Sequence, residues 1–182
     1  MFSFYKNNLD SIAKLFVNQL GMTIFGHLLF AATFKTDLRI ATGLLSSLFY
    51  LYLVYTTGWD IGAKDKIKVD GGRMNNTPHK GILLGLASNT LGIILSFINL
   101  VFYAIKFGDF TASVSLTAYT VATLINGMYA SFITMFEPPI MKFVILAVFL
   151  IPAIAVSGIS YYAGLKNFRI SVFLGLSKNK RK

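Results

Sequence analysis

The chain has 182 residues, of which 55% are hydrophobic and 13% are charged, with a formal net charge of +10 and a mean hydropathy of +0.65. Soluble domains carry about 25% charged residues, so this composition excludes an ordinary water-soluble fold and favours an integral membrane protein. Cysteine is absent, which excludes disulfides, thiolate catalysis and cysteine-bound metals. The basic excess is typical of loops and tails at a membrane surface, so we expect the lipid bilayer as partner, no nucleic acid and no cofactor.

The first eighteen residues form a predicted amphipathic lead-in. A helix cap is expected at Asn8–Ser11, and apolar residues then recur at helical spacing through Phe16. The segment lacks the early basic region, apolar run and cleavage site of a secretory signal peptide. We expect it to lie in the membrane interface and to lead into a first span that acts as an uncleaved signal.

Charged residues gather in clusters that are separated by five long gaps. The gaps contain no Asp, Glu, Lys or Arg and cover residues 15–34, 40–59, 81–105, 110–136 and 143–165. A helix needs about 20 apolar residues to cross a hydrocarbon core about 30 Å thick, and every gap reaches that length. The sequence therefore predicts an all-α, polytopic integral membrane helical bundle with about five transmembrane helices, forming a single transmembrane domain over residues 1–182.

His27 is the one histidine inside these gaps. An ionisable group within a membrane segment indicates function by default, here proton gating or contact with a ligand. The alternative is a neutral histidine that bonds to a neighbouring Ser, Thr or backbone carbonyl. No intramembrane carboxylate accompanies His27, and its separation from His79 does not match a metal-ligand spacing, so no metal site is predicted.

Residues 58–80 form a predicted basic connecting loop between the second and third spans. Turn formers occupy Asp70–Gly72 and Asn75–Pro78. A solvated connector is the simplest interpretation. The alternative is a site for anionic lipid headgroups, to which each basic residue would contribute about 1 kcal/mol. The candidates for headgroup binding are Lys64, Lys66, Lys68 and Arg73.

Three aspartates in the same segment raise the possibility of a lipid-modifying membrane enzyme. Asp60, Asp65 and Asp70 recur every five residues, which loosely resembles the aspartate motif of membrane CDP-alcohol phosphotransferases, where aspartates hold divalent metal near a phosphoester. The order of Asp, Gly, Ala and Arg departs from that family's pattern. A spacing of five also spreads carboxylates around a helix instead of aligning them. Asp60, Asp65 and His79 are the only candidates for this chemistry.

The third and fourth spans differ in their polar content. In the third, small residues predict one helix face for close packing, formed by Gly81, Gly85, Ser88 and Gly92. The fourth span, 110–136, is rich in Ser and Thr and contains Asn126, so we expect it inside the bundle, lining a cavity, or re-entrant before Pro138 and Pro139. With His27, Asn89 and Asn126 are the candidate ligand or pore residues.

The fifth span is apolar enough to face lipid, and Pro152 is expected to kink it. A basic tail follows at 166–182. Five spans place the termini on opposite sides of the membrane. The Lys and Arg of the loops are too evenly divided to fix the orientation, although a tail without acidic residues favours a cytoplasmic position.

Three functions remain as hypotheses. The first is a non-enzymatic subunit of a larger membrane assembly such as a transporter complex. The second is a self-contained transporter or channel for ions or small molecules, acting as a homo-oligomer, and the third is the lipid-modifying enzyme. In size and number of spans the chain resembles the substrate-binding subunits of energy-coupling-factor vitamin transporters, which usually have six helices. We expect a multi-pass protein of the cell membrane, and the richness in Lys, Asn, Ile and Phe favours a bacterial plasma membrane.

Overall fold

The computed structural model describes residues 2–105, 108–135 and 139–168, and every regular element in these ranges is helical. This confirms the all-α fold class. The elements are α1 (Phe2–Thr33), α2 (Arg39–Asp70), α3 (Lys80–Ser88), α4 (Thr90–Ile105), α5 (Gly108–Ile125), the 3₁₀ turn η1 (Gly127–Tyr129), α6 (Ala130–Ile133), α7 (Pro139–Val148) and α8 (Leu150–Leu165).

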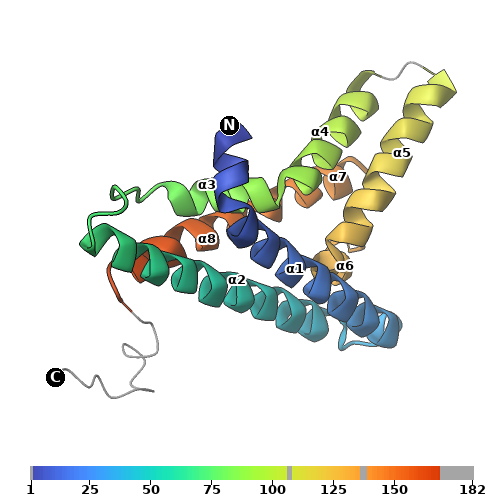
Figure 1. Cartoon of the computed structure of the whole chain (residues 1–182). Helices are drawn as coiled ribbons and strands as arrows, with labels where there is room; N and C mark the ends of the chain where they lie inside the picture. Colours follow the sequence, from blue (N-terminus) through green and yellow to red (C-terminus); the bar gives the residue numbers. More distant parts are fainter. Residues whose placement is uncertain (1, 106–107, 136–138, 169–182) are drawn as a thin grey trace.

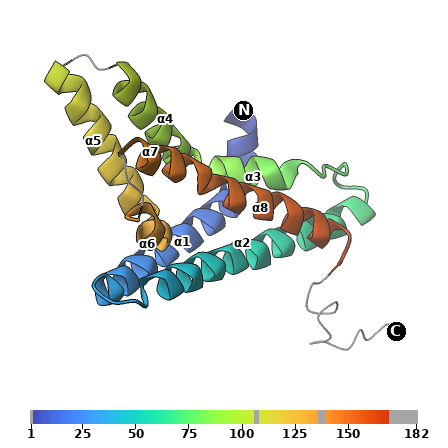
Figure 2. The same cartoon turned by 180° about the vertical axis from the view of Figure 1, so that it is seen from behind.

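Two long helices form the base of the molecule. α1 and α2 lie side by side, joined by a short connection at one end, while α8 packs along α2 and against α3 (Figures 1 and 2). α4 and α5 pair with each other and rise away from this base as an arm (Figure 1). We refer to α4 and α5 as the α4–α5 arm.

Three helical segments are long and apolar enough to cross a membrane: Phe4–Thr33, Arg39–Asp70 and Val144–Leu165. A fourth qualifies if α3 and α4, which are bent by 61° at Asn89, form one interrupted span. α5 is not among these candidates. Three or four candidate spans in the described residues are consistent with a membrane protein, which is a coarser result than the five crossings expected from the charge pattern.

Large apolar residues cover much of the surface, in addition to forming a buried core. Large apolar residues point outward, as at Leu48, Phe97 and Ile159, each more than 60% exposed. Several polar side chains are fully enclosed: Gln19, Asp65, Asn99, Asn126, Ser157 and Ser160. Soluble monomers rarely present so much apolar surface, whereas polar groups in a bilayer must find partners inside the protein.

α2 continues well beyond its apolar part, which corrects the predicted connecting loop at 58–80. Residues 58–70 are the last turns of α2, and only the segment 71–79 links α2 to α3. Ion pairs at helical spacing stabilise this polar end: Lys64 lies 2.5 Å from Asp60, and Lys66 lies 2.7 Å from Asp70. The aspartates and lysines between residues 58 and 70, which the sequence places in a loop, therefore lie on a helix.

The predicted lead-in is helical and continuous with α1. The break in regular geometry falls at Asn8 (φ −125°, ψ 15°), whose side-chain amide donates to the carbonyl of Phe4 at 2.9 Å. Helix α7 ends at Val148, one turn before Pro152, and Phe149 separates it from α8. Proline has no N–H for the carbonyl of Val148, so the interruption lies where Pro152 was expected to act.

The small-residue face of the third predicted span packs within the chain. A Cβ on Gly85 would lie 3.0 Å from Ser157 Cβ on α8, and one on Gly92 would lie 3.2 Å from Leu150 Cδ2. Ser157 also donates a hydrogen bond of 2.9 Å to the carbonyl of Gly81. Small residues let helix backbones approach closely, so α3 and α4 lie against α8 along this face.

Candidate functional site

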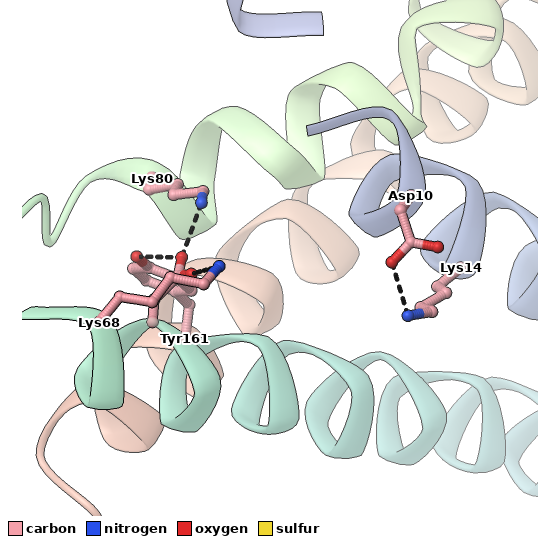
Figure 3. Close-up of polar contacts among 6 residues, drawn as sticks. Asp10, Lys14, Lys68, Lys80 and Tyr161 are labelled. Atoms are coloured by element: carbon pink, nitrogen blue, oxygen red, sulfur yellow. Dashed lines mark hydrogen bonds and ion pairs between the residues drawn. The ribbon is translucent and has the colours of Figure 1, made fainter. Parts of the chain in front are cut away.

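Asp65, near the end of α2, is the one buried charged residue among the described side chains. Its carboxylate is 2% exposed and receives three donors. Lys68 Nζ lies 2.9 Å from Oδ1, while Lys80 Nζ and the Tyr161 hydroxyl lie 2.6 Å and 3.1 Å from Oδ2 (Figure 3). One carboxylate thus joins α2, α3 and α8. We call Asp65, Lys68, Lys80 and Tyr161 the Asp65 cluster.

The charges of this cluster do not cancel. Two lysines face one carboxylate, which leaves a net positive charge of one. The side chain of Lys80 is 13% exposed, whereas that of Lys68 is 56% exposed. Each ammonium has three donors and uses one of them on Asp65, so further donors remain for a second anion. A buried carboxylate is stable only with such compensation, which also fixes the position of both lysines.

A pocket of about 700 Å³ opens directly beside the two lysines. It lies between the start of α1, the end of α2 and the segment that leads into α3. Its polar lining consists of Asn7, Asn8, Lys68, Asn76, Thr77, His79 and Lys80, and its apolar lining of Phe4, Met74, Pro78 and Leu83. We call it the basic pocket. Its volume falls in the usual range of small-molecule sites, about 300–1,000 Å³.

The four predicted headgroup residues do not converge on this pocket. Lys68 lines it, but Lys64 and Lys66 are paired with Asp60 and Asp70 on other faces of α2. Lys66 instead lines a second pocket of about 450 Å³, near Tyr162 and Lys166. Arg73 is exposed in the segment between α2 and α3. The role of these residues in lipid binding stays a prediction, and the structure adds Lys80 and His79 beside Lys68.

A second polar centre lies where interrupted helices meet. Gln19 Nε2 of α1 lies 3.4 Å from Asn126 Oδ1, at the break after α5. Asn126 Nδ2 would lie 3.7 Å from a Cβ on Gly92, just after the bend between α3 and α4, and Leu150 reaches the same point from the start of α8. Gln19 Oε1 has no hydrogen-bond partner among the described residues. Buried polar groups at helix breaks are typical of transporter binding sites.

The break after α5 exposes backbone carbonyls that side chains of α1 and α2 satisfy. Thr23 donates to the carbonyl of Ile125, and His27 Nε2 donates to that of Leu124 at 3.1 Å. Ser46 and Ser47 both donate to the carbonyl of Met128, at 2.8 Å and 3.2 Å. Broken helices are tolerated in a membrane when neighbours re-satisfy the freed groups, so these contacts explain how the break persists.

His27 is therefore held by a structural contact. Its ring lies against Gly127, and because a carbonyl can only accept, Nε2 carries the proton. Asn89 sits at the bend between α3 and α4, where its amide donates to the carbonyl of Gly85 at 2.9 Å and its Oδ1 lacks a partner in the part of the chain described. Roles of His27, Asn89 and Asn126 in binding or conduction stay predictions.

The three aspartates proposed for metal chemistry do not meet. Asp60 and Asp70 are exposed on α2 and each pairs with one lysine, while Asp65 is buried between two. Within the described ranges, no group of three His, Cys, Asp or Glu side chains is placed to hold a metal ion. His79 lines the basic pocket and is separate from Asp60.

No protein-family model matches this sequence, and no curated protein and no solved structure matches it either.

The Asp65 cluster could not be found from the sequence. Lys80 is 15 residues from Asp65, and Tyr161 is 96 residues away, so no local spacing links them. The one available signal was the pairing of Asp60 with Lys64 and of Lys66 with Asp70 at a separation of four. Such pairs indicate a helix, and a helical reading of 58–70 would have placed Asp65 between the two exposed pairs.

Proposed function

We propose that this protein is a non-catalytic, multi-pass subunit of a larger assembly in the cell membrane, and that α5 is its contact surface for a companion protein. In this proposal five segments lie in the bilayer: α1, α2, α3 with α4, α5, and α7 with α8. The observation that carries it is the composition of the two faces of α5.

The inner face of α5 packs against α4 and provides an example of a helix–helix contact within this chain. It buries small and hydroxyl side chains against α4, namely Thr111, Ser115, Ala118 and Ala122. Ser115 donates to Asn99 Oδ1 at 2.8 Å. Helix interfaces in membranes are enriched in such residues because they allow close approach and hydrogen bonding.

Part of the outer face of α5 carries similar small and hydroxyl side chains, but no other described helix covers them. Ser113, Thr117 and Thr120 are exposed at helical spacing, together with Ala112. Each hydroxyl donates to the carbonyl four residues earlier, at 2.8–2.9 Å, which leaves its oxygen free to accept a hydrogen bond. Ser113 and Thr117 also line a groove of about 330 Å³ between α4 and α5. The exposed side of α5 also carries Phe110, Leu116 and Leu124, as the outer faces of α2 and α8 carry leucine and isoleucine, and it differs from them in its exposed Ser and Thr hydroxyls.

Site-specific photocrosslinking in native membranes tests this proposal. A photoreactive residue is placed at position 113, 117 or 120, and at 48 or 159 as controls on the outward apolar faces of α2 and α8. We expect discrete protein adducts from the three α5 positions and none from the controls, and mass spectrometry then identifies the companion. Adducts only to a second copy of this chain, or equal adducts from all five positions, would overturn the subunit proposal.

A second candidate function is a self-contained transporter, favoured by the polar centre around Gln19 and Asn126. The buried oxygen Gln19 Oε1, which has no partner among the described residues and lies beside helix interruptions, is the kind of group that a solute or ion would satisfy. Flux measured in proteoliposomes of the purified protein tests this. Gln19→Met and Asn126→Leu would abolish flux, whereas Ser113→Leu would not. A protein that carries no flux and purifies with a fixed companion contradicts this candidate.

A further inference from the structure

We propose that the basic pocket binds the phosphate headgroup of an anionic phospholipid, with Lys68 and Lys80 as the anion ligands. This site is independent of the α5 surface and goes beyond the subunit function. The residues that form it come from four places in the chain: the start of α1, the end of α2, the segment before α3, and α3 itself.

The charge of the pocket matches a single phosphodiester. Asp65 neutralises one of the two lysine charges from behind and leaves a net charge of one facing the cavity. Because Asp65 receives hydrogen bonds from both lysines, at 2.9 Å and 2.6 Å, their ammonium groups are fixed before any ligand binds. Preorganised donors lose little conformational entropy on binding, which raises affinity for an anion placed between them.

The amides and the start of α3 add to this preference. Asn7, Asn76 and Thr77 supply neutral polar side chains around the lysines, and His79 lies at the N-terminal cap of α3 without a side-chain capping bond. The N-terminus of a helix carries a partial positive charge that favours phosphate. These contributions act in the same direction as Lys68 and Lys80.

The apolar wall of the pocket identifies the ligand as a lipid. Phe4, Met74, Pro78 and Leu83 supply apolar lining to a cavity of about 700 Å³, far more than an inorganic phosphate fills. Leu83 is 43% exposed on α3, next to Ile82, which is 45% exposed. The pocket lies at the junction of the candidate span Arg39–Asp70 and the interrupted pair α3 and α4. A lipid whose headgroup fills the pocket would lay its acyl chains along the apolar part of that span.

Lipid retention by the purified protein provides the test. The full chain is prepared in nanodiscs of phosphatidylcholine alone or mixed with phosphatidylglycerol, and bound lipid is counted by native mass spectrometry after release. Lys68→Gln is the diagnostic variant, because Lys80 still compensates Asp65. Lys64→Gln is the matched control, since it removes the same charge one helical turn away, outside the pocket. Leu83→Gln tests the apolar wall separately.

We expect one phosphatidylglycerol per chain and no retained phosphatidylcholine. Lys68→Gln should weaken retention about fivefold, the value for one lysine contact worth about 1 kcal/mol. Leu83→Gln should weaken it as well, and Lys64→Gln should not. Competition with inorganic phosphate and with glycerol phosphate distinguishes a lipid site from a site for free phosphate. Displacement by either soluble anion at the affinity of the lipid would overturn the proposal, as would equal losses in Lys64→Gln and Lys68→Gln.

Discussion

The Tyr161 hydroxyl of α8 lies 3.1 Å from Asp65 Oδ2 of α2, and this bond spans 96 residues of sequence. Both side chains are buried, and the same oxygen receives Lys80 from α3. Three helices that differ in length and direction are thus fixed at one carboxylate. The same carboxylate positions the lysines that line the basic pocket.

Tyr161→Phe removes only the hydroxyl of this contact. We expect the free energy of unfolding to fall by about 1.5 kcal/mol, because hydrogen bonds to charged groups contribute about 1.5–3 kcal/mol. Unfolding in mild detergent, followed by the fluorescence of the single tryptophan, Trp59 on α2, measures the change. The same substitution in an Asp65→Asn background should have a much smaller effect, and equal effects in both backgrounds would contradict the proposed coupling.

Asp65→Asn should be strongly destabilising. It leaves Lys80, at 13% side-chain exposure, without its compensating charge, and breaking a buried ion pair costs about 3–5 kcal/mol. Asp60→Asn is the control on the same helix, because its side chain is 52% exposed and its pairing with Lys64 is worth less than about 1 kcal/mol. Thermal denaturation monitored by circular dichroism compares the two, and similar melting temperatures would contradict the buried cluster.

Gly26→Ala should disrupt the contact between α1 and η1. A Cβ at this position would lie 2.5 Å from the carbonyl oxygen of Gly127 and 2.6 Å from the amide nitrogen of Met128. Backbone atoms cannot move aside like a side chain, so we expect a loss of about 1–3 kcal/mol in unfolding free energy. Gly21→Ala on the same helix meets nothing within 4 Å and should be neutral or stabilising by up to about 1 kcal/mol. Chemical denaturation of both variants provides the comparison.

Two buried serines should respond to alanine with opposite signs. Ser96 is 3% exposed and its hydroxyl has no partner among the described residues, so Ser96→Ala should leave stability unchanged or raise it by about 1 kcal/mol. Ser157 is 1% exposed and donates to the carbonyl of Gly81, so Ser157→Ala should lower stability by about 1 kcal/mol. Melting temperatures in detergent report both changes. A destabilised Ser96→Ala protein would show that Ser96 has a partner, such as an ordered water.

The positions of charges predicted the helical fold class but not the ends of the helices. Excluding Asp, Glu, Lys and Arg from long segments marks where a bilayer can lie, whereas helix ends depend on hydrogen bonding. α2 therefore runs on to Asp70, through a polar segment stabilised by Asp60–Lys64 and Lys66–Asp70. The charge pattern ended this helix where the apolar residues ended, about eleven residues too early.

The expectation for the fourth predicted span was correct for one of its faces. Thr111, Ser115 and Asn126 are buried, as their polarity suggested, but Ser113, Thr117 and Thr120 are exposed. The amino-acid composition indicates that these hydroxyl groups need hydrogen-bond partners, but it does not indicate whether the partners belong to this chain or to another. The Asp65 cluster was beyond sequence reasoning for a related reason, since Lys80 and Tyr161 reach Asp65 only after α3 and α8 have packed on α2.

The side chains that donate to the carbonyls at the break after α5 are synthesised before those carbonyls. Thr23, His27, Ser46 and Ser47 leave the ribosome before the carbonyls of Leu124, Ile125 and Met128, to which they donate. The donors in α1 and α2 therefore exist before the discontinuous segment that needs them has been made. A chain that lost α1 would leave the carbonyls of Ile125 and Leu124 without the donors Thr23 and His27, while Met128 would keep those from α2.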